Sequence, residues 1–320
     1  MRYIGIILIL CISLLSHAQI SDSLSSVNKD TFKYDHSTFV ILDSVVVKAQ
    51  KRGFDVSDFI DMVKNDNSFY IAFKNLRFAG YDFYNDIVFY NKKNGIKASY
   101  KSLAHQDFNG RCRTMAIIRT DENKKFYKRN GKVKYYTAKL YEKIFFTKDS
   151  VCDEKRTDII DYNAKPKNKI DKYILELKKL IFSPGKKVNI PFIGSKMEIF
   201  SKKMSKYYNF HIDHYMYNDT IEAYVFTAKV KPEYVKKENK TVVKYLQTYF
   251  SKKDFQVLAR NYHLKYKTLL YNFDVKMDIK LNKTNNKYYP EYIKYQGDWH
   301  VLFKKRERCK FITKIYNLKI

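Results

Sequence analysis

The segment that decides the fold is FDVKMDIKLN, residues 273–282. Its apolar residues occupy every second position, at Phe273, Val275, Met277, Ile279 and Leu281, and polar residues fill the positions between them. Period-two alternation is the pattern of a β-strand with one buried face and one solvated face. The segment therefore predicts a sheet that is covered on one side only.

Further strands are expected on both sides of this segment. Downstream of the middle of the chain, residues 223–230, 242–250, 255–266 and 311–316 are rich in Tyr, Phe and Val or are mainly apolar. Upstream, 69–136 contains Asn94-Gly95, Asn109-Gly110 and Asn130-Gly131 between apolar segments. Asn-Gly provides the two positive-φ residues of a type I′ hairpin turn. The pattern predicts antiparallel meanders, because parallel strands need long crossovers. Turns are also expected at Asn285-Asn286 and Gln296-Gly297.

Helical periodicity occurs before and between these strands. Val56, Phe59, Ile60 and Val63 form one stripe and predict a helix over 55–65 with Asp55 as N-cap. A helical insert is expected over about 138–207. Its parts are a helix or a strand at 140–145, a helix at 170–181 stopped by Pro184-Gly185, and a helix from Ser195 with Glu198 completing a capping box.

The expected fold class is mainly β (α+β). We expect one curved antiparallel sheet or unclosed β-barrel, with three to four helices packed on its concave face. Such curvature reduces the problem of exposed sheet edges. Residues 39–320 are expected to form a single domain, because no linker is evident after residue 50.

The first 18 residues have the pattern of a secretory signal peptide. Arg2 precedes the apolar run Ile4–Leu15, and Ser16-His17-Ala18 offers small residues for cleavage. The run is shorter than the roughly 20 residues of a spanning helix, and Cys11 lies inside it, unlike a lipidated cysteine. An uncleaved anchor is the alternative. We expect cleavage near Ala18-Gln19, a disordered polar leader over 19–38, and export to the periplasm or beyond without membrane insertion.

The net charge limits which classes of partner are expected. The formal charge is +29, which favours anionic partners such as envelope polymers. Lysine outnumbers arginine 51 to 11, which AT-rich codon usage also produces. Nucleic acid is not an expected partner, because proteins that recognise nucleic acids rely on arginine.

After signal cleavage the cysteines are Cys112, Cys152 and Cys309, and Cys112–Cys152 is the expected disulfide.

Motifs for chemistry are few. His211-Ile212-Asp213-His214 puts only two metal-type residues on one strand face, and Ser183-Pro184-Gly185-Lys186 ends a helix instead of opening one. The basic run Lys304–Arg308, beside Trp299, fits a solvated strand or a contact to an anionic head group. We therefore predict no catalytic residue, no metal ligand and no cofactor, and we do not expect an enzyme. A hydrolase with a non-standard site is the weakest alternative.

The order helix, meander, helical insert, meander resembles the periplasmic lipoprotein-carrier (LolA/LolB-like) superfamily over roughly 53–317. A local likeness, in Leu42–Val47 followed by an aromatic strand at Phe69–Phe73, is to uncharacterised exported bacterial proteins. In the carrier family an apolar cavity holds acyl chains. The resemblance implies an exported carrier or chaperone for a lipid, lipoprotein or other amphiphile. The alternative function is a cell-envelope structural or interaction protein that binds anionic surface components.

The aromatic and aliphatic faces of two neighbouring strands are the candidate ligand site. The candidate cavity residues are Tyr262, Leu264, Tyr266, Phe273, Val275, Met277 and Ile279. They fit the wall of a ligand cavity or a packed core under the helical insert.

Overall fold

The computed structural model describes residues 56–123, 126–154, 182–188, 193–237, 239–268, 271–301 and 305–320. All of them belong to the compact unit Val40–Ile320. The expected signal peptide, leader, Leu42–Val47 segment, Asp55 cap and 170–181 helix lie outside the described residues.

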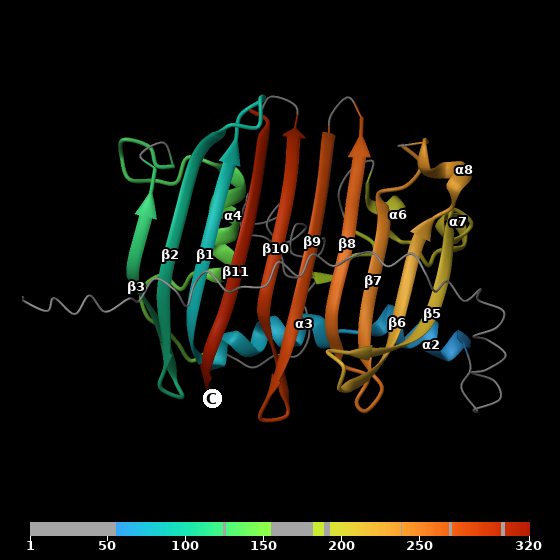
Figure 1. Ribbon diagram of the computed structural model, residues 1–320, viewed down its shortest axis with the longest axis horizontal. Coiled ribbons are helices and arrows are strands. Elements are labelled where there is room, and N and C mark those ends of the chain that lie inside the picture. The colour runs from blue at the N-terminus through green and yellow to red at the C-terminus, as the bar shows by residue number, and fades with distance from the viewer. Residues whose placement is uncertain are drawn as a thin grey trace, which may run out of the picture. The chain divides into compact units, whose positions relative to one another are not determined.

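A single antiparallel sheet of eleven strands forms the body of this unit (Figure 1). Its order is β4-β3-β2-β1-β11-β10-β9-β8-β7-β6-β5, with β4 and β5 at separate ends, so the sheet is not closed. The strands are β1 (Gly80–Tyr90), β2 (Ile96–Phe108), β3 (Cys112–Glu122), β4 (Val151–Cys152), β5 (Tyr208–Tyr217), β6 (Ile221–Val230), β7 (Val243–Ser251), β8 (Val257–Lys267), β9 (Tyr271–Thr284), β10 (Lys287–Val301) and β11 (Glu307–Lys319). The predicted mainly β class and unclosed antiparallel sheet are confirmed.

Two meanders meet inside this sheet. Strands β1–β4 form one and β5–β11 form the other, and they join where β1 pairs with β11. The decisive segment lies in β9, between β8 and β10 of the longer meander, and its odd-numbered residues from Phe273 to Leu281 are buried. The predicted order of two meanders separated by an insert is therefore present.

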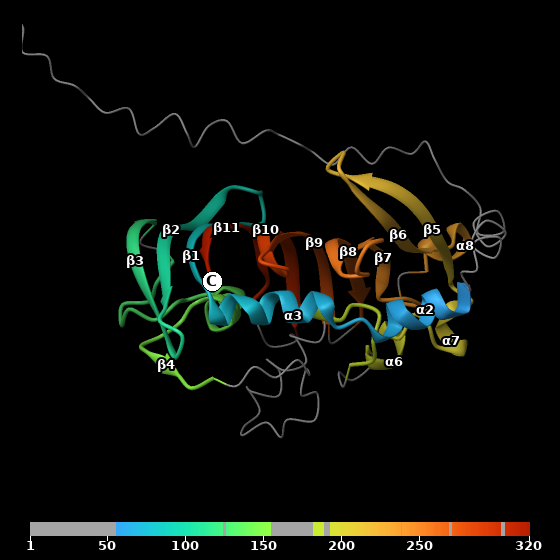
Figure 2. The same cartoon turned by 90° about the horizontal axis from the view of Figure 1, so that it is seen from below.

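Helices cover one face of the sheet, which we call the inner face (Figure 2). They are α2 (Val56–Asn65), α3 (Ser68–Asn75), α4 (Tyr136–Phe145) and α6 (Gly194–Met197); the 3-10 turn η2 (Leu76–Phe78) follows α3, and α7 (Lys202–Ser205) and α8 (Pro232–Val235) flank β5 and β6. Aromatic rings attach α2 and α4 to the strands. Phe59 of α2 packs edge-on against Phe250, and Tyr141 of α4 packs against Phe311 with ring centroids 5.0 Å apart.

The aromatic strand expected at Phe69–Phe73 is wrong, because this segment is helix α3. Phe69, Ala72 and Phe73 are buried, and their spacing of three and four residues matches a helical stripe. Aromatic content favoured a strand, but the burial of one helical face decides the structure.

The insert is less helical than expected. The segment 140–145 is helical, within α4, but β4 at Val151–Cys152 pairs with β3 inside the expected helical range. The capping box at Ser195 is also wrong, because Ile193 precedes α6 and Glu198 ends it. A second short helix, α7, then follows from Ser201. The predicted single helix is therefore replaced by two one-turn helices, α6 and α7.

Two of the three predicted Asn-Gly hairpins join strands, β1 to β2 and β2 to β3, but their turn types differ from the prediction. In the first pair only Asn94 has a positive φ, of 63°, and in the second only Gly110, of 89°. A type I′ turn needs both central residues at positive φ, so neither pair forms one. Asn130-Gly131 makes a small loop closed by a single bridge between Tyr127 and Val133. Asn285-Asn286, with both φ positive, joins β9 to β10.

The expected disulfide Cys112–Cys152 is formed and ties β4 to β3, while Cys309 is free and buried. Among the described residues, none of the helices is long and apolar enough to cross a membrane.

Candidate functional site

The seven candidate cavity residues lie together on the inner face of β8 and β9. Cross-strand register pairs Tyr262 with Met277, Leu264 with Val275 and Tyr266 with Phe273. Directly opposed residues of an antiparallel pair share one face. All seven are buried, with exposed fractions of 0–4%. We call this set the central apolar surface: Tyr262, Leu264, Tyr266, Phe273, Val275, Met277 and Ile279.

Strand β10 extends the central apolar surface with residues that sequence reasoning missed. Trp299 stacks on Phe273 with ring centroids 5.0 Å apart, and its indole N–H donates to the Tyr295 hydroxyl. Tyr295 in turn stacks on Phe311 of β11 at 5.0 Å. The turn expected at Gln296-Gly297 is wrong, because β10 runs through both residues and Gly297 pairs with Val275. The alternation Ile293, Tyr295, Gly297, Trp299 was the signal that identified a strand there.

Gly297 makes room for the Tyr295 side chain, which lies along the strand towards Trp299. A Cβ at Gly297 would overlap the phenol oxygen and ring of Tyr295. Tyr295 is buried and cannot swing into solvent.

Replacing Gly297 by alanine is therefore expected to lower the free energy of unfolding by about 1 to 3 kcal/mol, the usual cost of overpacking. Urea denaturation measures this change. Gln296→Ala, at the neighbouring exposed position of the same strand, serves as the control and should stay within about 0.5 kcal/mol of wild type. A Gly297→Ala protein as stable as wild type would contradict this packing.

Two buried phenols, Tyr262 within the central apolar surface and Tyr295 beside it, are neutral. The Tyr262 hydroxyl donates to the Met277 sulfur at 2.7 Å. Burial raises the pKa of Tyr262 and of Tyr295 well above the usual range. Both phenols therefore stay protonated at any physiological pH, and the surface offers an apolar ligand no fixed charge.

A lysine lies at the rim of the central apolar surface. The Lys196 ammonium of α6 sits over the Tyr266 ring, 4.7 Å from its centroid, and also donates to the Tyr266 hydroxyl. It donates as well to the Asn239 carbonyl at 2.7 Å. Lys196 thus ties α6 to the end of β8.

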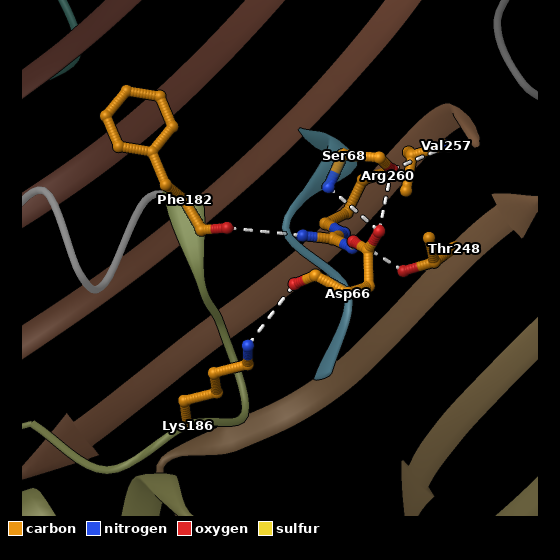
Figure 3. A network of polar contacts seen from close by, with 7 residues as sticks. All are labelled: Asp66, Ser68, Phe182, Lys186, Thr248, Val257 and Arg260. Atoms are coloured by element: carbon orange, nitrogen blue, oxygen red, sulfur yellow. Dashed lines mark hydrogen bonds and ion pairs between the residues drawn. The ribbon is translucent and has the colours of Figure 1, made fainter. Parts of the chain in front are cut away.

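A buried polar network fixes α2 and α3 to one side of the central apolar surface (Figure 3). Arg260 of β8 pairs with Asp66, which lies between the two helices, at 3.2 Å, and both side chains are at most 8% exposed. Arg260 also donates to the Thr248 hydroxyl at 3.0 Å and to the Phe182 carbonyl at 3.3 Å. The Asp66 carboxylate accepts from the Ser68 backbone N–H and hydroxyl. The helix linker is therefore bound to the inner face by charge and by hydrogen bonds.

A second buried network holds α4 on the other side. The Tyr141 hydroxyl contacts Asn85 of β1 and Thr313 of β11. Asn85 donates to the Ser102 hydroxyl of β2 at 3.2 Å. At the start of α4, the Glu307 carboxylate accepts from the backbone N–H groups of Tyr136 and Thr137. The central apolar surface therefore lies between two polar attachment points.

The motifs considered for chemistry form no reactive arrangement among the described residues. His211, Asp213 and His214 lie along β5, and no group of three or more metal-type side chains is found in this part of the chain. The Lys186 ammonium donates to the Asp66 carbonyl at 3.2 Å, which directs it into the Arg260 network. Lys304 of the basic run lies outside the described residues; Arg306 and Arg308 both pair with Asp298.

Comparison with known proteins gives no match to a family model and no match among curated proteins. Three solved structures are similar to this chain. A DUF1329 family protein from Desulfovibrio piger is 9% identical, with 79% of this chain and 91% of that chain covered and a TM-score of 0.24. A putative outer membrane lipoprotein-sorting protein domain from Vibrio parahaemolyticus is 7% identical, with coverage of 79% and 91% and a TM-score of 0.25.

The third is a LolA superfamily protein from Nitrosomonas europaea, 7% identical, with coverage of 81% and 92% and a TM-score of 0.24. At TM-scores this low, the function has to be inferred from the residues of this chain.

Proposed function

We propose that this chain is an exported, non-enzymatic binding protein that carries or chaperones a lipid, lipoprotein or other amphiphile on its central apolar surface. The observation that carries this proposal is the continuous apolar inner face from Tyr266 through Phe273 to Trp299, next to which the buried Tyr262 phenol stays neutral. An acyl chain needs apolar contact without fixed charge, and this buried face would provide it when the chain displaces the groups that pack on it.

The two polar networks support the same role. They fasten α2, α3 and α4 to the sheet at the sides, through Arg260 and Tyr141. Fixed attachments on both sides of the face limit the rearrangement that a ligand has to cause when it displaces the groups that bury this face. Lys196 at the rim suits an amphiphile whose polar head stays at the end of β8.

The single tryptophan of the chain makes this proposal testable. Detergent-free protein, stripped of bound lipid, is titrated with dibrominated stearic acid. Bromine atoms quench indole fluorescence on contact, so saturable quenching of Trp299 is expected, and unbrominated stearic acid should compete. Val275→Phe, which fills the central apolar surface, is expected to weaken binding about tenfold, or about 1.4 kcal/mol.

Lys276→Phe puts the same ring on the opposite face of β9 and should bind as wild type does. Circular dichroism verifies that both variants are folded. Mass spectrometry of lipids extracted from the purified wild-type protein gives a result that depends on no variant. Unsaturable quenching together with a lipid-free extract would refute the proposed function.

A further inference from the structure

The outer face of the sheet, opposite the helices, carries a cross-strand row with an unusual charge pattern. We call it the outer row. Register places its members side by side from β3 to β9: Arg119, Leu103, Tyr84, Lys314, Tyr292 and Lys280. All six are at least partly exposed. The row therefore contains three cations and two tyrosines and not one carboxylate.

The neighbouring row shows that this pattern is not general for the outer face. Its members, in the same strand order, are Asp121, Lys101, Asp86, Ile312, Lys294 and Asp278. Here lysines and carboxylates alternate, as expected where opposed charges stabilise a sheet. Other carboxylates of the outer face are matched as well: Asp82 pairs with His105 at 2.6 Å and Asp298 with Arg306 at 2.6 Å. The outer row therefore differs from its neighbouring row in carrying cations without a carboxylate beside them.

The two-strand spacing in the outer row belongs to its lysines, since Arg119 on β3 lies three strands from Lys314 on β11. Lys314 and Lys280 lie two strands apart, on β11 and β9, with Tyr292 of β10 between them. Neighbouring strands are about 4.8 Å apart, so the two lysines recur at about 10 Å. Lys310 and Lys276 repeat this spacing across Gln296 in a parallel row. Cations separated by two strands, with a ring between them, suit a partner whose charges are also separated by a ring.

The side chains identify the chemistry of that partner. Burial raises the pKa of Tyr84 and of Tyr292, so both phenols are neutral and able to hydrogen-bond hydroxyl groups. The cations are mainly lysines, which act as point charges and lack the planar fork that arginine offers to phosphate. Sugar rings present hydroxyls and apolar faces to tyrosine, and their carboxylates pair with lysine.

We propose that the outer row binds an acidic polysaccharide with one carboxylate per disaccharide, which lies across the strands. The carboxylates pair with Lys314 and Lys280, and the intervening sugars contact Tyr292 and Tyr84. This binding is independent of the proposed carrier function, because the outer row lies on the opposite face of the sheet from the central apolar surface.

Isothermal titration of the full-length protein with a hyaluronan decasaccharide in low salt tests the proposal. Hyaluronan supplies one carboxylate per disaccharide. We expect saturable binding that is lost when the salt is raised to about 1 M, where the Debye length is about 3 Å. Neutral dextran should not bind. Tighter binding of oligo(dT) or of phosphatidylglycerol vesicles would overturn the proposal in favour of a nucleic acid or a membrane.

Two matched double variants locate the site. Lys314→Gln with Lys280→Gln is expected to weaken hyaluronan binding about tenfold, since each exposed ion pair contributes up to about 1 kcal/mol. Lys101→Gln with Lys294→Gln removes the same charge from the neighbouring row and should change binding less than about twofold. Equal losses in both would show attraction by net charge alone and overturn the assignment. Quenching by brominated stearic acid should be unchanged in both, which separates this test from that of the carrier function.

Discussion

Replacing Arg260 by methionine is expected to lower the free energy of unfolding by about 3 to 5 kcal/mol, the cost of leaving one charge of a buried pair without its partner. The Asp66 carboxylate would keep its bonds to Ser68 but lose the guanidinium at 3.2 Å. The Thr248 hydroxyl and the Phe182 carbonyl would each lose a donor as well. Chemical denaturation followed by circular dichroism measures the effect.

Two further variants show whether burial is the cause. Arg111 also makes two hydrogen bonds to one carboxylate, that of Asp153, but these side chains are 74% and 65% exposed. Arg111→Ala should therefore cost less than about 1 kcal/mol. Adding Asp66→Asn to Arg260→Met should restore part of the lost stability, because it removes the unpaired charge. A loss no larger for Arg260→Met than for Arg111→Ala would disprove the network's role.

Removal of the Cys112–Cys152 disulfide is expected to have the second large effect. The bond closes a loop of 40 residues, and the chain-entropy relation gives about 4 kcal/mol of stabilisation for that length. Replacing both cysteines by serine should lower the melting temperature, and a phosphine reductant should do the same to wild type. The two-residue strand β4 depends most on this bond, since its pairing covers only Cys112 and Arg113 of β3.

The double-serine protein is its own control for side effects of the reductant. Its melting temperature should not change when reductant is added, because Cys309 is a free thiol in the wild type already. An equal shift in wild type and variant would attribute the effect to the reagent. Equal melting temperatures for oxidised wild type and the double-serine protein would mean that the bond does not stabilise the fold.

The sequence pattern predicted strands and their buried residues best where one face of a strand is buried and the other is exposed to solvent. Strand β9 alternates in sequence because its odd positions face the helices and its charged positions face solvent. In β8 this signal is weak, because Val257 and Ala259, on the opposite face from Leu258 and Arg260, are buried too. Even so, the two strands together were enough to predict that seven side chains share a face.

Long-range contacts account for what sequence could not predict. Nothing near Arg260 indicates a buried guanidinium, because its partner Asp66 is 194 positions away. In the sequence, Gly297 resembles a turn glycine. In the structure, the Tyr295 side chain occupies the space that a Cβ at position 297 would fill. The aromatic content of Phe69–Phe73 favours a strand, although its buried residues are spaced as in a helix. Local pattern identifies a covered face and not the groups that cover it.

The pairing of β1 with β11 has a consequence for how this protein is made. Thr313 meets Asn85 across that junction, and the two residues are 228 positions apart. During synthesis β2 follows β1 directly and can pair with it early. The other edge of β1 stays unpaired until β11, the last strand of the sheet, has been made. An unpaired edge of this kind is a template for wrong pairing between nascent chains, and such distant contacts fold slowly. Aggregation during production should therefore decrease when a chaperone shields β1 until β11 has emerged.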